Sequence, residues 1–502
     1  MNIRLKKYIN TSYASALAHL VLIVFVCLGY VYYIQVQPSP DQQLFDYVGW
    51  HLVNGHTLYL DVFEINFPIK PAIHMLSIKL FGAEIWSFRT LDYLMNVLIA
   101  VAGYAFFRKL GFALAAVVFV PVYLLSYVTA GAWMAGQIDH TAHAFLFLSL
   151  ISLSLSQRMR ECTLLPPLAG ALSALSFLTK PTMLTFPVGA ALVLLLMGYR
   201  ANQLRQSARL SALFVCGFLL VLIVFVTFGQ MTGQLTGFWQ QAVTFNIQVY
   251  GAEEAPQSLS GTVLILLRSL IVIAVLGGMG FFVMSLKSDL RTEFILFGLL
   301  FCTIALSYVY QNKGFGYHLG GIILLFAFGT AFFIGVTGQW MQADERRSVL
   351  GLGIVAICLL LVFVSLGKKI VASDPLSVEF GLTRLEQKEI LDIIAAQKDS
   401  DSTLIIWGRH YHVGMLADLP SAWPFINAPL RGGAHLVPEW QEMASKRLQN
   451  ECPRFVMVTN AELSDDVHTT STLQALLRRQ LQEGYQPAFQ TDLVTLFMNK
   501  AC

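Results

Sequence analysis

Long apolar runs recur along most of the chain, and they constrain its fold more than any other feature of the sequence. About eleven of these runs measure roughly 17 to 25 residues, which is the length that an α-helix needs to cross a lipid bilayer. The sequence therefore predicts a mainly α fold, a polytopic membrane bundle of about eleven transmembrane helices. The runs cover approximately residues 13–34, 88–107, 111–130, 141–157, 163–179, 182–199, 210–229, 260–285, 292–310, 319–338 and 348–367.

The scarcity of charged residues supports a membrane protein and excludes one class of partner. Only 13% of the residues are charged and 56% are hydrophobic, whereas an ordinary soluble domain has about 25% charged residues. The net charge is +3, and the basic residues are dispersed. Because binding to nucleic acid needs a concentrated basic face, we expect membrane lipids around this chain and no nucleic acid.

Basic residues gather between alternate apolar runs and predict the orientation of the bundle. The positive-inside rule assigns these ends to the cytoplasm, together with the N-terminus, whose long apolar run is typical of a retained signal anchor. The predicted external segments are then residues 41–89, 130–140, 230–260 and 311–318, with Lys180. The basic ends carry Arg4, Lys6, Lys7, Arg108, Lys109, Arg158, Arg160, Arg200, Arg205, Arg209, Lys287, Arg291, Arg346 and Arg347.

The composition changes after residue 367, where charged residues return. We expect two domains, a transmembrane domain over residues 1–367 and a small soluble α/β domain over residues 368–502, with a helix near 385–396 and strands near 402–407 and 455–459. An odd number of spans places the second domain outside, in the periplasm if the host is a Gram-negative bacterium. The predicted location is therefore the bacterial inner membrane.

The seven cysteines divide between the apolar runs and the soluble domain. No CxxC or zinc-binding spacing occurs among them. Cys452 and Cys502 are the two in the soluble domain, and an oxidising external compartment permits a disulfide between them. That disulfide is a prediction of the sequence.

Carboxylates follow the first apolar run directly, between residues 41 and 68. Charged groups close to a bilayer are costly, so an acidic cluster there indicates a functional site. Asp41 is the first candidate for a catalytic base, with helix capping or simple exposure as the alternative. The segment also carries Asp61 and Glu64, and Tyr59 between the glycines and Pro68.

A second acidic residue, Asp139, precedes two histidines at the external entrance of the fourth span. It could share acid–base work with Asp41 or orient an acceptor. The simpler alternative is that Asp139 caps the helix, a role that aspartate often fills. His140 and His143 lie one helical turn apart and with Asp139 could bind a metal, although histidines in membranes more often satisfy local hydrogen bonds.

Cationic residues mark two further external positions. Residues 310–318 read Tyr-Gln-Asn-Lys-Gly-Phe-Gly-Tyr-His, and Lys180 ends the fifth span. Lys313 and His318 could hold a phosphate and stabilise it as a leaving group, and Lys180 could be a second phosphate ligand. The alternative is interfacial anchoring, because Lys and Tyr commonly occupy helix ends at membrane surfaces.

Taken together, these motifs resemble those of polytopic GT-C glycosyltransferases of the family 39 type, which include the aminoarabinose transferase acting on lipid A and the protein O-mannosyltransferases. The resemblance implies a polyprenyl-phosphate sugar donor, Asp41 and Asp139 as catalytic residues, and Lys313, His318 and Lys180 as phosphate ligands. Asp61, Glu64, Tyr59 and Tyr317 become candidates for acceptor binding or loop support. A basic residue that often follows the family's acidic pair is replaced here by residues Ile65, Asn66 and Phe67, and Lys70 is a candidate substitute.

The resemblance implies inverting transfer of the sugar to an acceptor hydroxyl on a glycan, lipid or protein. It requires no cofactor and leaves room for a divalent cation. Two alternatives stay open at this point: a flippase or transporter of lipid-linked glycans, and an O-antigen ligase or polymerase with a diphosphate-linked donor. Transporters tend to carry charges near the membrane midplane in repeated halves, whereas here the ionisable residues gather on one predicted face.

Overall fold

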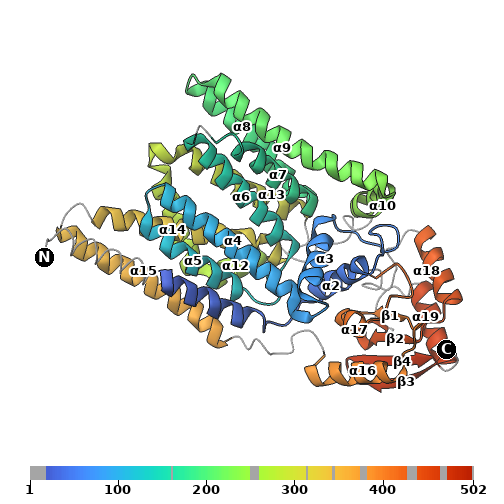
Figure 1. Ribbon diagram of the computed structural model, residues 1–502. Coiled ribbons are helices and arrows are strands. Elements are labelled where there is room, and N and C mark those ends of the chain that lie inside the picture. Colours follow the sequence, from blue (N-terminus) through green and yellow to red (C-terminus); the bar gives the residue numbers. More distant parts are fainter. Residues whose placement is uncertain are drawn as a thin grey trace. The chain divides into compact units, whose positions relative to one another are not determined.

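The computed structural model describes residues 19–159, 162–248, 259–311, 315–341, 345–372, 382–426, 438–463 and 472–499. The chain divides into two compact units (Figure 1). The helical unit comprises Met1–Val36, Arg89–Val224 and Glu254–Pro375. The mixed unit comprises Gln37–Phe88, Phe225–Glu253 and Leu376–Cys502, so it joins a segment after the first apolar helix to the end of the chain.

Apolar helices make up the described part of the helical unit. Six helical segments of the described chain are long and apolar enough to cross a membrane, and five more apolar helices are shorter, among them His19–Tyr33. The chain is thus that of a multi-pass membrane protein, while the number of eleven spans stays a prediction. The helices are α4 (Ile85–Lys109), α5 (Ala113–Val128), α6 (Ile138–Arg158), α7 (Leu165–Thr179), α8 (Thr185–Arg200), α9 (Leu204–Met231), α12 (Leu259–Ser285), α13 (Arg291–Gln311), α14 (Gly321–Met341) and α15 (Glu345–Ala372), with short turns η1 (Pro181–Leu184), η4 (Ser288–Leu290) and η5 (Gly316–Leu319).

Aromatic packing and serine hydroxyls hold this unit together. Phe328 of α14 stacks on Phe297 and Phe107, with ring centroids 4.1 and 4.4 Å apart. Between α6 and α7, the Ser149 and Ser173 hydroxyls are 2.9 Å apart. Hydroxyls that bond across helices stabilise close packing where lipid supplies no hydrophobic driving force. These contacts pack α6, the helix that carries Asp139 in its first turn, against α7.

The mixed unit places a small sheet beside short helices. The strands β1 (Leu404–Trp407), β2 (Phe455–Thr459), β3 (Tyr485–Gln490) and β4 (Val494–Asn499) lie in the order β1-β2-β4-β3. β1 pairs with β2 in parallel, and the other two pairings are antiparallel. The remaining elements are α2 (Pro40–Val53), α3 (Ile69–Phe81), α10 (Gln234–Phe238), η2 (Trp239–Thr244), α11 (Phe245–Gln248), α16 (Arg384–Gln397), α17 (His412–Leu416), α18 (Pro438–Asn450), η6 (Asn460–Leu463) and α19 (Thr472–Gly484).

Phe63 brings the segments of the mixed unit into one core. Its ring lies 4.9 Å from Trp440, 5.3 Å from Phe425 and 6.0 Å from Phe245. Its backbone N–H donates to the carbonyl of Pro424 at 2.9 Å. The loop between α2 and α3 is therefore packed on segments that are far away in the sequence.

The structure describes six of the seven cysteines. Cys452 is disulfide-bonded, whereas Cys27, Cys162, Cys216, Cys302 and Cys358 are free. Cys502, the predicted partner of Cys452, lies outside the described residues.

Candidate active site

Asp41 stands in the first turn of α2. Ser39 caps this helix, with its side chain accepting the N–H of Gln42, and Pro40 occupies the first helical position. Proline there is favourable because its fixed φ suits the helix and the missing N–H would have no helical partner. The Asp41 side chain is half-buried and lies at the N-terminal end of the helix, where the helix dipole is positive.

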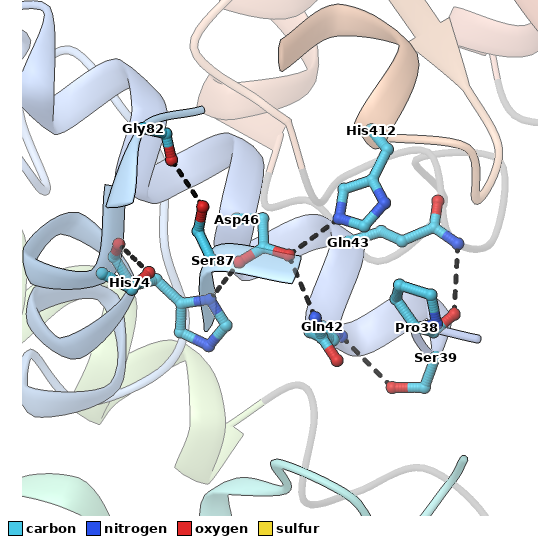
Figure 2. Close-up of polar contacts among 10 residues, drawn as sticks. Pro38, Ser39, Gln42, Gln43, Asp46, His74, Gly82, Ser87 and His412 are labelled. Carbon is cyan, nitrogen blue, oxygen red and sulfur yellow. Dashed lines mark hydrogen bonds and ion pairs between the residues drawn. The ribbon is translucent and has the colours of Figure 1, made fainter. Parts of the chain in front are cut away.

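A buried carboxylate in α2 that accepts from two histidines is a residue that sequence analysis missed. Asp46 Oδ1 lies 2.6 Å from His74 Nδ1, and Asp46 Oδ2 lies 2.7 Å from His412 Nε2. Gln42 Nε2 also donates to Oδ2 at 3.3 Å. Figure 2 shows the carboxylate between the two imidazole rings. The histidines are 28 and 366 residues away in the sequence, so no local pattern could indicate this cluster.

The histidines keep the Asp46 carboxylate charged despite its burial. Burial alone would raise its pKa, but the charge of His74 and the hydrogen bonds from His412 and His74 outweigh burial and lower the pKa to about 2. Hydrogen bonds to the charged form of an acid favour that form. Asp46 is therefore ionised throughout the physiological range.

Glu64 behaves in the opposite way. Burial raises its pKa to about 7, only partly offset by hydrogen bonds from the backbone and side chain of Asn66 and the backbone of Ile65. Its Oε1 accepts from Asn66 N at 2.8 Å and Asn66 Nδ2 at 2.6 Å. Its Oε2 is buried and has no hydrogen-bond partner in the described structure. Glu64 is thus a carboxyl group that changes charge near neutral pH.

Tyr59 and Asp61 support the loop that carries Glu64. The Tyr59 hydroxyl donates to the carbonyl of Asn66 at 2.7 Å, and its ring packs on Phe238. Gln241 Nε2 donates to the Tyr59 carbonyl at 2.9 Å. Asp61 is exposed and accepts the N–H of Thr57 at 2.7 Å. The contacts of Tyr59 and Asp61 are therefore within the loop and with the helices around Gln241.

In the helical unit, Asp139 and Lys180 form an ion pair. Lys180 Nζ lies 2.5 Å from Asp139 Oδ1, and the carboxylate is fully buried. Lys180 ends α7 in an extended conformation, as expected for a residue before proline. Asp139 does not cap α6, because Gln137 occupies the N-cap position and Asp139 lies inside the first turn. The capping alternative is wrong.

His143 and His318 lie around this ion pair. Both interact electrostatically with Asp139. The backbone N–H of Gly321 donates to His143 Nδ1 at 3.1 Å, so the proton of a neutral imidazole must sit on Nε2. Oδ2 of Asp139 and Nε2 of His143 are both buried and have no hydrogen-bond partner among the described residues.

Two predicted residues precede α14. His318 is buried in η5, and Tyr317 stacks on Trp133 with ring centroids 6.2 Å apart. Lys313, which was predicted to bind phosphate together with His318 and Lys180, lies outside the described residues. The structure therefore groups Asp139, Lys180 and His318, and it describes Tyr317 as an aromatic contact.

His140 takes part in a different network. Its Nε2 lies 2.9 Å from Asn96 Oδ1, beside the Tyr123 hydroxyl at 3.2 Å. Within the described ranges, no three His, Cys, Asp or Glu side chains are arranged to hold a metal ion. His140 thus has a local hydrogen-bond role in α6.

A neighbouring buried network in the same unit was also missed by sequence analysis. Asp92 Oδ2 accepts from the hydroxyls of Tyr33 at 2.5 Å and Tyr127 at 2.7 Å, and Arg89 donates to the Tyr33 hydroxyl at 3.1 Å. An arginine and an aspartate three residues apart in an apolar stretch are the signal that could have found it.

Known proteins with a similar sequence or structure indicate the fold to which this site belongs. A family model described as dolichyl-phosphate-mannose-protein mannosyltransferase matches residues 67–230. The structure is similar to that of ArnT from Cupriavidus metallidurans bound to undecaprenyl phosphate, with a TM-score of 0.67, 13% identity and coverage of 98% of each chain. It is also similar to the Archaeoglobus fulgidus oligosaccharyltransferase in the apo form, with a TM-score of 0.52, 10% identity and coverage of 96% of this chain and 74% of that chain.

The chain has a GT-C glycosyltransferase-like fold. The resemblance predicted from the sequence motifs is thereby confirmed. No curated protein matches at the level of sequence. Because the identities are low, the comparison with solved structures gives the fold, and the chemistry must be argued from the residues.

Proposed function

We propose that this protein is a membrane glycosyltransferase that moves a sugar from a polyprenyl-phosphate donor to an acceptor hydroxyl. The observation that carries the proposal is the buried Asp139–Lys180 pair beside His318, in a GT-C-like fold. Buried ionisable groups in a membrane bundle are expensive and mark functional sites. ArnT, which has a similar fold, was crystallised with undecaprenyl phosphate.

The proposed reaction is an inverting displacement at the anomeric carbon. Asp41 takes the proton of the acceptor hydroxyl, and the hydroxyl oxygen forms the new bond to the anomeric carbon. The bond from that carbon to the phosphate oxygen breaks with its electron pair. Lys313, His318 and Lys180 stabilise the departing polyprenyl phosphate, as fixed cationic groups do where charge develops.

Asp139 has a binding role in this scheme. Lys180 occupies its Oδ1, whereas Oδ2 and the Nε2–H of His143 are buried with no described partner. A sugar hydroxyl could accept from that N–H and donate to Oδ2 at once. Asp139 therefore orients a substrate hydroxyl through Oδ2, while Lys180 pairs with Oδ1.

The proposal includes a location. We place the site on the periplasmic face of a bacterial inner membrane, with residues 1–367 in and around the bilayer and residues 368–502 outside it. Support comes from the alternation of basic residues along the sequence, which orients membrane helices. A lipid-linked donor reaches such a site within the membrane.

Purified protein in detergent tests the donor and the stereochemistry together. We expect transfer from a polyprenyl monophosphate sugar, no transfer from a nucleotide sugar, and an inverted anomeric configuration by NMR. Lys313→Ala should raise the apparent KM for the donor and lower kcat, because a contact with the leaving group also acts in the transition state. Turnover only with a diphosphate-linked donor would favour the ligase alternative. Binding and translocation of a lipid-linked glycan without transfer would favour a transporter.

A further inference from the structure

Asp46 joins three segments of the mixed unit through one carboxylate. It projects from α2 and accepts from His74 of α3 at 2.6 Å and from His412 of α17 at 2.7 Å. Asp46 and both histidines are buried. Figure 2 shows that the two rings approach different oxygens of the same carboxylate. Removal of this carboxylate would leave two buried ring N–H groups without their acceptor, which is costly in a protein interior.

Other residues of α2 contact the segment that follows α17 on one side and α3 on the other. The Tyr47 hydroxyl donates to the carbonyl of Leu419 at 2.9 Å. The N–H of Ser421 donates to His51 Nε2 at 3.4 Å. Burial and His56 lower the pKa of His51 to about 3, so the ring is neutral, and its proton sits on Nδ1 because Nε2 accepts. On the other side, α3 comes so close that a Cβ on Gly49 would lie 2.8 Å from the backbone of His74 and Met75.

We propose that Asp46 is a positioning residue whose bonds to His74 and His412 form a clamp that fixes α2 and thereby orients Asp41. Asp41 lies five residues earlier on the same helix, which is about 7.5 Å along the axis. A displacement of about 1 Å in a catalytic group can cost a hundredfold in rate. The proposal rests on the proposed function in one respect, namely that Asp41 is the base.

The clamp needs a carboxylate because both partners donate. Two oxygens can accept from two N–H groups at once, whereas an asparagine offers one acceptor and one donor. The other titratable side chains on the three elements are Asp41, Tyr47 and His51 of α2 and Lys70 and Lys79 of α3, and His410 directly precedes α17. Of these, His410 is buried and has its pKa lowered to about 4 by burial and by the charge of Arg409.

Paired substitutions at the two histidines distinguish a clamp from simple packing. The Nδ2 of asparagine can replace a ring Nδ1, and the Nε2 of glutamine can replace a ring Nε2, so the two positions should respond in opposite order. His74→Asn should keep kcat within about threefold of wild type, whereas His74→Gln should lower it about tenfold to a hundredfold. His412→Gln should be the mild variant and His412→Asn the severe one. Loss of the stacking of His74 on Phe88 is common to both variants at that position.

Asp46→Asn adds a pH signature. One histidine must then accept from Asn Nδ2, which a neutral imidazole can do and a protonated one cannot. The ratio of wild-type to variant kcat should therefore rise about tenfold from pH 8 to a pH low enough to protonate the imidazole that must accept. The donor KM should change little.

A readout without activity separates this inference from the proposed function. Hydrogen–deuterium exchange of the full chain should show faster exchange of the α2 amides in Asp46→Asn, His74→Gln and His412→Asn, and near wild-type exchange in the two mild variants. If wild type transfers no sugar but this exchange pattern appears, the proposed function fails and the clamp stands as a structural fact. The clamp would be refuted if the same substitution, asparagine or glutamine, were the milder one at both histidines. It would also be refuted if the ratio of wild-type to Asp46→Asn kcat did not change with pH.

Discussion

Asp41 is the residue on which the proposed chemistry depends most. Asp41→Asn keeps the shape of the side chain but removes the base, so we expect normal folding and a loss of transfer of about a hundredfold to ten-thousandfold. Product formation by the purified variant measures this. The matched control is Asp418→Asn, an exposed carboxylate of the same unit at φ 53, a conformation that asparagine also tolerates. Equal activities of the two variants would remove Asp41 from the mechanism.

Glu64 predicts a pH dependence of stability with a definite sign. Its pKa is about 7 in the folded protein and about 4.3 in an unfolded chain. The folded state therefore binds more protons between these values, so the contribution of Glu64 to stability is complete below about pH 4.3 and is lost as pH rises towards 7. Glu64→Gln keeps an acceptor for Asn66 and cannot ionise. Its melting temperature should rise relative to wild type between pH 5 and pH 8.

Tyr59→Phe is the control for that experiment. It removes the hydroxyl that donates to Asn66 in the same loop, and burial holds the pKa of Tyr59 well above its usual value. The variant should therefore melt lower by the same amount at every pH in the range. A Glu64→Gln curve that stays parallel to wild type would show that Glu64 does not titrate there.

Single residues could be found in the sequence only where their chemistry is local. Asp41, Asp139, Lys180 and His318 stand out because charged or polar groups beside apolar runs are unusual. The pairing of Asp139 with Lys180 was not predictable, because the residues are 41 positions apart and meet only after α6 packs on α7. Asp46 was missed for the same reason, since its partners come from elements that only the folded chain brings together.

At the scale of elements, the contact of α14 with α6 fixes His143. A Cβ on Gly321 would lie 2.6 Å from His143 Cγ, so no larger residue fits there without a shift. Gly321→Ala should move His143, weaken the N–H bond to its Nδ1, and cost about 1 to 3 kcal/mol of stability. Thermal melting in detergent measures the cost, and sugar transfer should fall with it.

Gly298→Ala of α13 is the matched control, because its Cβ would meet nothing within 4 Å. Alanine is the better helix former, so this variant should melt at or above the wild-type temperature. If both alanine variants behave alike, the close approach of Gly321 to His143 does not constrain the site.

Helices and strands were predictable from the periodicity of the sequence. The prediction failed where tertiary contacts decide whether an element forms. The helix expected near 385–396 is α16, and the strands expected near 402–407 and 455–459 are β1 and β2. The last two strands were not predicted: β3 contains a proline and pairs irregularly with β4, and its burial does not alternate cleanly. The helices around Gln241 were also missed, because their short apolar turns contact the Tyr59 loop rather than form a long periodic face.

At the scale of the whole molecule, the composition of the sequence predicted a bundle of membrane helices, but it could not fix the number of membrane spans. Hydrophobic runs identify membrane helices because a bilayer imposes a minimum apolar length. Several described helices are apolar but shorter than that length, including α5 and α7. Their buried faces in the helical unit pack against other helices, so length alone cannot decide whether such a helix crosses the membrane.

Orientation is the property of the whole molecule that the proposed function requires and that labelling can test. The alternation of basic ends predicts that residues near 316 and 400 are external and that the turn between α8 and α9, with Arg200 and Arg205, is cytoplasmic. Single cysteines at Gly316, Ser400 and Ala201 would be introduced after replacement of the five free cysteines. An impermeant thiol reagent should label the first two positions in cells with a permeabilised outer membrane, and Ala201→Cys only after lysis of the inner membrane. If positions 316 and 400 were both protected from the reagent until lysis, the site would face the cytoplasm. Nucleotide sugars are supplied there, so the reason for a lipid-linked donor would be lost, and with it the proposed reaction.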